Sequence, residues 1–207
     1  TGAMQGKFWK VMNFMDLPAA FQRAMEALLG EGYPAYLASL EQPSRRGLRR
    51  NPLKCSQPQL EAALPFALEP TAFSPLSYAF AAGEEGVGRL PAHHAGLFYV
   101  QEPSACSAVT VLAPQPGEKV LDLCAAPGGK SFALAMAMQN RGTIRSFDLH
   151  KSKIRLIQES AARLGITCIQ AQSADGKVFQ PELEKTADVV LCDVPCSGLG
   201  IIRKKPD

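Results

Sequence analysis

The sequence predicts an α/β fold, in which helices cover a parallel β-sheet, preceded by a smaller α+β module. The second half of the chain alternates short apolar runs with amphipathic segments at helical spacing, as a doubly wound sheet requires. Val120, Leu121 and Leu123 form an apolar run typical of a central parallel strand buried on both faces. A turn of small residues follows at 125–129, and a helix is predicted over 130–138.

Two helices are predicted near the start of the chain. Apolar residues recur at helical spacing over 17–28, Asp16 is a suitable N-cap, and Gly30 supplies the stop. A second helix is expected to begin near Pro34. Residues 1–14 are expected to be a tag or leader, because Thr-Gly-Ala-Met is typical of an expression scar.

The densest basic stretch of the chain is 44–54, with the sequence Ser-Arg-Arg-Gly-Leu-Arg-Arg-Asn-Pro-Leu-Lys. In an arbitrary protein, a solvated strand with charged flanks is the commoner interpretation of such a stretch. The other hypothesis is that its arginines hold nucleic-acid phosphate, which gives affinity and salt dependence without sequence choice. The candidate phosphate-binding residues are Arg45, Arg46, Arg49 and Arg50.

The region between the basic stretch and the central strand contains a predicted domain boundary. A short helix is predicted over 56–64 and a strand over 73–80. The glycine-rich segment 83–88 is interpreted as a flexible turn. The boundary therefore separates an N-terminal module, 15–88, from a larger domain, 89–207.

The larger domain is expected to begin with a helix over 103–112 and to alternate strands and helices after the central strand. The later predicted elements are a strand over 143–147 that ends at Asp148, a helix over 151–164, and strands over 166–171 and 187–192. A sheet of this class needs about three more strands after the fourth. We therefore expect the C-terminal part of the fold to be missing from this chain.

Composition limits the classes of function. Hydrophobic content of 46% and charged content of 20% describe an ordinary globular protein, and a net charge of +3 does not by itself indicate nucleic acid. The six cysteines lack metal-ligand spacing, and the adjacent His93 and His94 point in different directions, so no metal site is expected. Free thiols suggest a reducing, cytoplasmic location. No segment approaches the ~20 apolar residues of a membrane span, so no membrane association is expected.

The loop after the central strand offers unpaired backbone N–H groups and the positive end of a helix dipole to a ligand. Gly129-Lys130-Ser131 completes the second half of a P-loop, but that pattern needs glycine where Cys124 stands. Pro127 also removes a donor from the loop, and no Gly-x-Gly-x-x-Gly dinucleotide fingerprint is present. The remaining hypothesis is a loop that binds S-adenosylmethionine (SAM), with a P-loop NTPase as the disfavoured alternative.

Two motifs carry a resemblance to a known family. Asp-Leu-Cys-Ala-Ala-Pro-Gly-Gly-Lys-Ser at 122–131, followed by Asp-Val-Pro-Cys-Ser-Gly at 193–198, resembles the Sun-type (NOL/NOP/Sun) RNA 5-methylcytosine methyltransferases, in particular the bacterial 16S ribosomal RNA branch. Residues 89–106 are similar to the entry into that family's catalytic domain. The resemblance covers about 15–207. It implies a Rossmann-like class I SAM-dependent methyltransferase fold, SAM as cofactor, a 16S rRNA substrate with tRNA as the alternative, and a monomer.

Candidate cofactor contacts follow partly from position and partly from the resemblance. Asp148 ends the second predicted strand of the sheet, where an acid can accept both ribose hydroxyls. The resemblance implies that Asp175 lies near the adenine, that Asp122 supports the loop, and that the 44–54 stretch faces RNA. The residues expected to line the cofactor are Cys124, Ala125, Ala126, Pro127, Gly128, Gly129, Lys130, Asp148, Asp175 and Asp193.

The catalytic candidates are Asp193 and Cys196. Cytosine C5 is a weak nucleophile, so a thiolate must add to C6 before C5 attacks the methyl group of SAM. Asp193 is expected to hydrogen-bond the N3/N4 edge of cytosine. The resemblance implies that Cys196 assists product release while a second cysteine, expected beyond residue 207, attacks C6; in DNA cytosine methyltransferases the Pro-Cys thiol attacks instead. Cys168 and Cys192 are expected to be inert core residues. The alternative function is a chain that only binds SAM or RNA.

Overall fold

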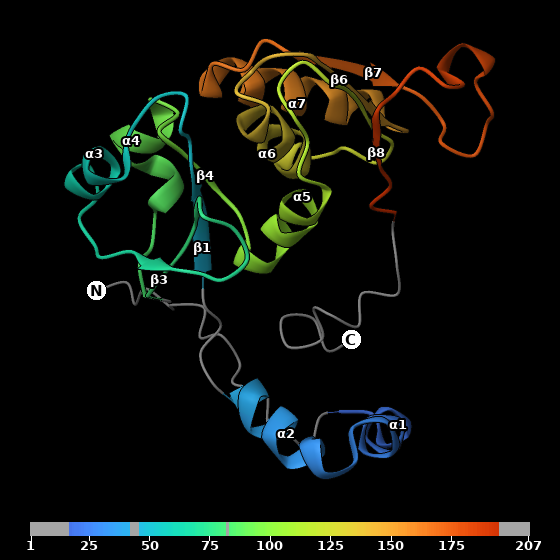
Figure 1. Ribbon diagram of the computed structural model, residues 1–207. Helices are drawn as coiled ribbons and strands as arrows, with labels where there is room; N and C mark the ends of the chain where they lie inside the picture. The colour runs from blue at the N-terminus through green and yellow to red at the C-terminus, as the bar shows by residue number, and fades with distance from the viewer. Residues whose placement is uncertain (1–16, 42–45, 82, 195–207) are drawn as a thin grey trace, which may run out of the picture. The chain divides into compact units, whose positions relative to one another are not determined.

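The computed structural model describes residues 17–41, 46–81 and 83–194. The described residues fall into two compact units, 17–41 and 46–194, which are considered separately (Figure 1). Several predicted features lie outside the described residues: the tag at 1–14, Asp16, Arg45 and Cys196.

The first unit contains two helices, α1 (Ala19–Leu29) and α2 (Tyr33–Glu41), joined by a 3-10 turn. Gly30 follows α1 with φ +52°, a conformation that favours glycine, and its N–H donates to the carbonyl of Glu26. Both predicted helices and the predicted stop at Gly30 are confirmed.

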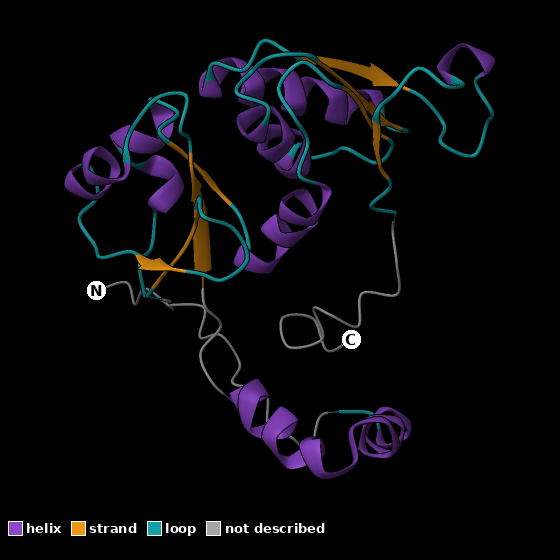
Figure 2. Ribbon diagram, in the orientation of Figure 1, coloured by secondary structure: helices purple, strands orange, loops and turns teal. Residues whose placement is uncertain are grey.

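The second unit begins with an antiparallel four-stranded sheet in the order β2-β3-β1-β4 (Figure 2). Its elements are β1 (Arg46–Arg50), α3 (Gln57–Ala62), β2 (Glu69–Pro70), β3 (Ser77–Phe80), α4 (Pro91–His94) and β4 (Phe98–Val100). Leu48 of β1 and Phe98 of β4 are fully buried at its centre. The strand predicted over 73–80 begins only at Ser77, because a turn in which Ser77 N–H donates to Ser74 O at 3.0 Å precedes it.

A parallel four-stranded sheet in the order β7-β6-β5-β8 forms the rest of this unit. Its elements are α5 (Ser107–Leu112), β5 (Lys119–Asp122), α6 (Gly129–Ala137), β6 (Thr143–Asp148), α7 (Lys151–Leu164), β7 (Ile169–Ser173) and β8 (Val189–Leu191). The predicted α/β alternation is confirmed. The helix predicted over 103–112 divides into a 3-10 turn and α5. The strand predicted over 166–171 begins later, because the N–H of Ile166 still donates to Ala161 O of α7 at 2.9 Å.

Helices α6 and α7 pack against the parallel sheet (Figure 2). Phe132 and Leu134 of α6 meet Ile144 of β6 and Ile157 and Leu164 of α7, and all five are fully buried. This packing fixes the strands so that the carboxyl ends of β5, β6 and β7 meet at one edge of the sheet. No helix in the described ranges is both long and apolar enough to cross a bilayer.

A buried asparagine joins the two sheets of the second unit. Asn51 follows β1, and its Nδ2 donates to Gly96 O at 2.9 Å and to Leu164 O at 2.8 Å. Gly96 has φ +75°, and a Cβ there would lie 2.1 Å from the carbonyl oxygen of Arg163, so the close approach requires glycine. The domain boundary near residue 88 stays a prediction, with β4 beyond it contributing to the first sheet.

Candidate functional site

The segment called here the loop 124–130 lies between β5 and α6 at the carboxyl edge of the parallel sheet, and its last two residues begin α6. Ala125 N–H donates to Phe147 O of β6 at 2.8 Å, which holds the loop against the neighbouring strand. Gly128 has φ +107°, and a Cβ there would lie 2.3 Å from the Phe132 ring, so this position needs glycine for both conformation and space. The loop is therefore tightly packed where it enters the amino end of α6, and the backbone N–H groups there are available to a ligand.

Asp122, the last residue of β5, is a buried carboxyl beneath this loop. Ser131 Oγ donates to Asp122 Oδ2 at 2.6 Å and lies 2.8 Å from Ser146 Oγ. Burial raises the pKa of Asp122 to about 6, while the hydrogen bond from Ser131 and the charge of Lys130 act in the opposite direction. The carboxyl links the first turn of α6 to β5 and β6, which fits the supporting role expected for it.

Asp148 ends β6, as predicted, and is 9% exposed. Its Oδ2 accepts the N–H of Ala126 in the loop 124–130 at 3.3 Å, and its Oδ1 accepts the N–H of His150 at 3.0 Å. Lys153 Nζ lies 3.9 Å from the same Oδ1. Asp148 therefore contacts the loop directly and also shapes the turn into α7, and its contact with ribose stays a prediction.

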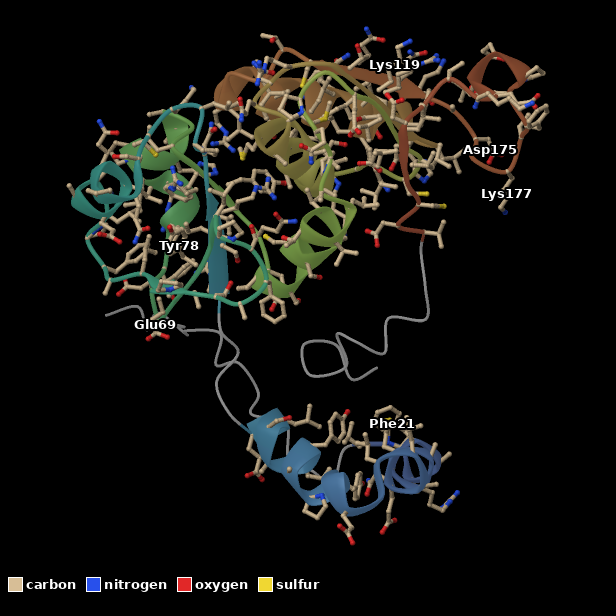
Figure 3. All side chains as sticks on the ribbon, viewed as in Figure 1. Phe21, Glu69, Tyr78, Lys119, Asp175 and Lys177 are labelled. Carbon is tan, nitrogen blue, oxygen red and sulfur yellow. The ribbon has the colours of Figure 1, made fainter. Side chains whose placement is uncertain are left out.

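Asp175 lies in the loop that follows β7 (Figure 3). Its side chain is exposed, and Oδ1 accepts the N–H of Lys177 at 2.9 Å, as a turn residue does. The preceding Ala174 donates its N–H to the backbone oxygen of Asp148 at 3.1 Å. The two predicted acids thus follow neighbouring strands at the same edge of the sheet.

A pocket of about 210 Å³ opens beside the loop 124–130. Lys130 Nζ and Asp193 Oδ2, 2.5 Å apart, form an ion pair at its wall. The Asp193 side chain is 52% exposed, so its second carboxylate oxygen is within reach of a ligand. The lining residues are Tyr99, Val100, Gln101, Cys124, Ala125, Ala126, Pro127, Gly129, Lys130 and Asp193. Of the predicted cofactor contacts, Gly128, Asp148 and Asp175 do not line this pocket.

Sequence reasoning gave no role to Tyr99 or Gln101, which bring the end of β4 into the pocket. A Cβ on Gly129 would lie 3.2 Å from Gln101 Nε2 and 3.3 Å from Tyr99 Cε1. The second glycine of Pro-Gly-Gly therefore lets β4 approach the loop. Both residues belong to the 89–106 segment that carries part of the family resemblance. That resemblance was the one feature of the sequence that could have indicated a role for them in the site.

Cys124, Cys192 and Cys168 have different surroundings in the structure. The thiol of Cys124 lines the pocket, and its pKa is raised by partial burial and by nearby groups that include Cys192, Asp122 and Asp148. These surroundings keep it a neutral thiol and a poor nucleophile. The expectation that Cys192 lies in the core is wrong: β8 ends at Leu191, and Cys192 is exposed just beyond it. Cys168 is buried, as expected.

The structure corrects the expectation that Arg49 contacts RNA. Arg49 is 1% exposed, and its Nη1 donates to the carbonyl oxygen of Gly129 at 2.9 Å and to Oε1 of Gln101. Because side chains alternate along β1, Arg49 lies on the face opposite to Arg46 and Arg50, and on that face it meets Gln101 and Gly129. Arg46 and Arg50 are partly exposed, and each donates one hydrogen bond to a backbone carbonyl. These two remain candidates for phosphate contact.

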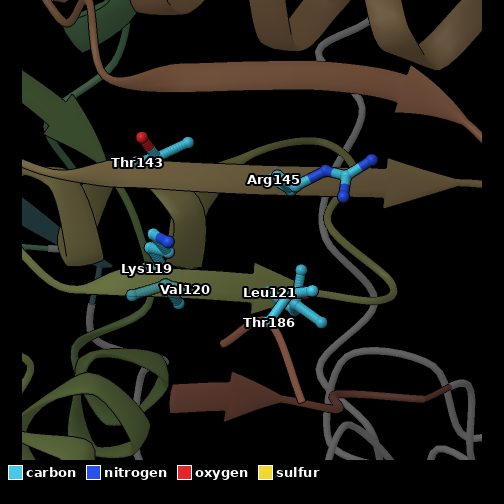
Figure 4. Close-up of a pocket in the computed structure, with 6 residues that line it drawn as sticks. All are labelled: Lys119, Val120, Leu121, Thr143, Arg145 and Thr186. Carbon is cyan, nitrogen blue, oxygen red and sulfur yellow. The ribbon is translucent and has the colours of Figure 1, made fainter. Parts of the chain in front are cut away.

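A second cavity, of about 230 Å³, lies on the parallel sheet away from the loop 124–130 (Figure 4). It is lined by Lys119, Val120, Leu121, Thr143, Arg145 and Thr186. Lys119 and Thr143 begin β5 and β6, so the cavity extends toward the amino ends of the strands, opposite to the site. Among the described residues, no group of three or more His, Cys, Asp or Glu side chains is arranged to hold a metal ion.

Comparison with known families gives two consecutive matches. The family described as "16S rRNA methyltransferase RsmB/F" matches residues 109–207, which include the loop 124–130 and Asp193. The "N-terminal domain of 16S rRNA methyltransferase RsmF" matches residues 17–103, which include β1 and Gln101.

Individual relatives agree with these matches. The chain is 34% identical over 197 residues to ribosomal RNA small subunit methyltransferase F of Enterobacter sp. (strain 638), covering 91% of this chain and 41% of the relative. It is 47% identical over 116 residues to "Probable ribosomal RNA small subunit methyltransferase B" of Bacillus subtilis (strain 168), covering 54% of this chain and 25% of the relative. The chain therefore spans less than half the length of these curated relatives.

Solved structures show the same fold. A methyltransferase homologue from Pyrococcus horikoshii superposes with a TM-score of 0.80 at 29% identity, covering 92% of this chain and 66% of that one. NSun6 from the same organism, crystallised with SFG, gives a TM-score of 0.77 at 19% identity over 88% of this chain and 71% of that one, and this likeness concerns the fold alone.

Proposed function

Because the chain belongs to the RsmB/F family of 16S rRNA methyltransferases, we propose that it serves the transfer of a methyl group from SAM to C5 of a cytosine in 16S rRNA. The observation that carries the proposal is the ion pair of Lys130 and Asp193 beside a glycine-dependent loop at the end of β5. That arrangement places a loop suited to a cofactor next to a carboxylate that can hydrogen-bond a nucleobase.

The residues of the site fit SAM. A side chain at Gly128 would collide with Phe132, and one at Gly129 would crowd Tyr99 and Gln101, so the backbone can pack closely here. The amino end of α6 then offers its backbone N–H groups to the cofactor. Asp148, which ends β6, is the proposed acceptor for the ribose hydroxyls, and Asp175 the proposed neighbour of the adenine. SAM supplies an electrophilic methyl group when it is bound.

The proposed role of Asp193 is recognition of the base. Its carboxylate accepts from the N4 amino group of cytosine, where uracil offers an oxygen instead. The charge-assisted hydrogen bond from Lys130 fixes the orientation of the carboxylate, because an N–H donor with a full charge binds an ionised oxygen more strongly than a neutral donor does.

The proposed chemistry needs a thiolate at cytosine C6, and the surroundings of Cys124 argue against that residue. Cys196 belongs to the same Asp-Val-Pro-Cys motif as Asp193, and we assign it to assist the release step. In that step a general base takes the C5 proton of the methylated cytosine, the C5=C6 double bond re-forms, and the C6–S bond breaks as the attacking thiolate leaves. For RNA binding, Arg46 and Arg50 are the proposed phosphate contacts.

Bisulfite sequencing of total RNA from cells with and without the gene tests the proposal. A cytosine of 16S rRNA should resist conversion only in cells that carry the gene. Resistance of a tRNA cytosine instead would support the alternative substrate, and no difference in any RNA would refute the proposal. Calorimetric titration should give a binding isotherm with SAM and none with ATP and Mg²⁺, since Cys124 and Pro127 do not fit a phosphate-binding loop.

A further inference from the structure

Gln101, the residue that follows β4, presents its amide to the pocket beside Lys130 and Asp193. The side chain is partly exposed, and Nε2 lies so close to Gly129 that a Cβ there would be 3.2 Å away. No described residue accepts a hydrogen bond from Nε2. The pocket therefore has an amide donor on its wall that the described residues do not use.

The orientation of the Gln101 amide is set by the contacts of its oxygen, Oε1. Oε1 of Gln101 accepts from Nη1 of Arg49 and lies 3.6 Å from the Sγ of Cys106. A guanidinium has only donors, so an amide nitrogen could not replace Oε1 in this position. The oxygen must face Arg49, and Nε2 must then face the loop.

Arg49 is built to hold that orientation. Its guanidinium carbon lies 5.5 Å from the centre of the Tyr99 ring, and Nη1 also donates to Gly129 O at 2.9 Å. Burial lowers the pKa of Arg49, and none of the described carboxylates forms an ion pair with it. A buried cation without a carboxylate is costly, and the groups that this one contacts are Gln101, Gly129 and the Tyr99 ring.

We propose that Gln101 is a substrate-contact residue whose Nε2 donates to O2 of the target cytosine, and that Arg49 is a positioning residue that fixes the amide of Gln101. This inference rests on the proposed function. Cytosine offers one donor, the N4 amino group, and two acceptors, N3 and O2. With Asp193 at the N3/N4 edge, O2 is the acceptor farther from that carboxylate, and it is the one that a neutral donor on another part of the wall can reach.

Gln101→Glu tests the contact, because it keeps the size of the side chain and an oxygen for Arg49 while removing the donor. We expect kcat/KM for methyl transfer to RNA to fall roughly tenfold to a hundredfold, with no change in the dissociation constant for SAM. Gln158→Glu, at an exposed glutamine of α7, is the matched control and should leave both quantities unchanged. Weaker SAM binding by Gln101→Glu with normal RNA kinetics would assign the amide to the cofactor and overturn the proposal.

A substrate analogue tests whether O2 of the target cytosine is the atom that Gln101 contacts. RNA in which sulfur replaces O2 of the target cytosine offers a poorer acceptor, so it should slow the wild-type protein but slow Gln101→Glu little further. Equal slowing of both proteins would overturn the contact with O2.

Arg49→Lys tests the positioning role. It should lower methyl transfer when Gln101 is present and add little in the Gln101→Glu background, because a carboxylate has no amide orientation to fix. Equal losses in both backgrounds would show a merely structural arginine. If the wild-type protein modified no cytosine, the proposed function would fail as well; if the wild type is active and Gln101→Glu equals it, only this inference fails.

Discussion

Lys130 Nζ lies 2.5 Å from Oδ2 of Asp193, and this contact joins the first turn of α6 to the residue pair that follows β8, 63 positions later in the chain. The two residues belong to separate sequence motifs. Their pairing brings a loop suited to a cofactor and a carboxylate suited to a base to the same pocket.

Breaking this pair should slow methyl transfer by a larger factor than it weakens cofactor binding. Asp193→Asn removes the charge while keeping the shape, and we expect a loss of roughly a hundredfold or more in the rate of methyl transfer, the scale seen when one oriented polar group is removed from an active site. The measurement is single-turnover transfer of a labelled methyl group to RNA. Lys185→Met is the control, because it removes an exposed lysine whose ion pair with Glu184 involves no residue that lines the pocket. An unchanged rate for Asp193→Asn would remove the carboxylate from the mechanism.

Asp148→Ala should weaken SAM binding by ~1.5–3 kcal/mol, because a charged hydrogen bond to the ribose is lost. The variant also removes an acceptor for the Ala126 N–H, so the loop 124–130 loses one of its supports. Isothermal calorimetry measures the change. Asp188→Ala is a matched control, since Asp188 also accepts a backbone N–H, that of Lys119, but at the amino end of β5. Equal affinities for Asp148→Ala and the unmodified protein would exclude Asp148 from the site.

The buried carboxyl of Asp122 should make stability depend on pH. Its pKa is raised from 3.8 to about 6, so the folded protein holds this proton more tightly than the unfolded chain does. The contribution of this group to the free energy of unfolding is fully present below about pH 4. It is lost as pH rises through about 6, and the loss is on the order of 3 kcal/mol. Asp122→Asn cannot ionise at this position, so its free energy of unfolding should rise relative to that of the wild type between pH 4 and pH 7. Parallel stability curves for the two proteins would contradict this.

Much of the fold was predictable because its signals are local. The apolar run at Val120, the small-residue turn and the helix over 151–164 each depend on neighbouring residues, and the structure has these elements where they were predicted. The acid at the end of β6, Asp148, was predictable for the same reason.

Other features depend on distant partners. Arg49 looks like its partly exposed neighbours Arg46 and Arg50 in sequence, yet it is buried and donates to the carbonyl oxygen of Gly129, 80 positions later. Gln101 gains its place in the pocket from the pairing of β4 with β1, which no periodicity in a three-residue strand could announce. Cys192 was misplaced because β8 ends one residue earlier than its apolar pattern suggested.

Arg46 and Arg50 should contribute to RNA affinity through phosphate, and Arg49 should not. Charge reversal of both, Arg46→Glu with Arg50→Glu, should weaken RNA binding and lower the slope of log affinity against log salt by roughly 1 for each lost contact. Filter binding over a range of salt concentrations measures the slope. Arg155→Glu, at an exposed arginine of α7, is the control. A slope that stays the same in the double variant would return these arginines to the role of solvated strand ends.

The most direct measurement is bisulfite sequencing of 16S rRNA from a strain that lacks the gene and is complemented with either the unmodified gene or one encoding Asp193→Asn. The wild-type gene should restore a cytosine that resists conversion. The Asp193→Asn gene, expressed to the same level, should leave that cytosine fully converted. Equal protection by both genes, or no protected cytosine with either, would contradict the proposal that this pocket methylates cytosine in 16S rRNA.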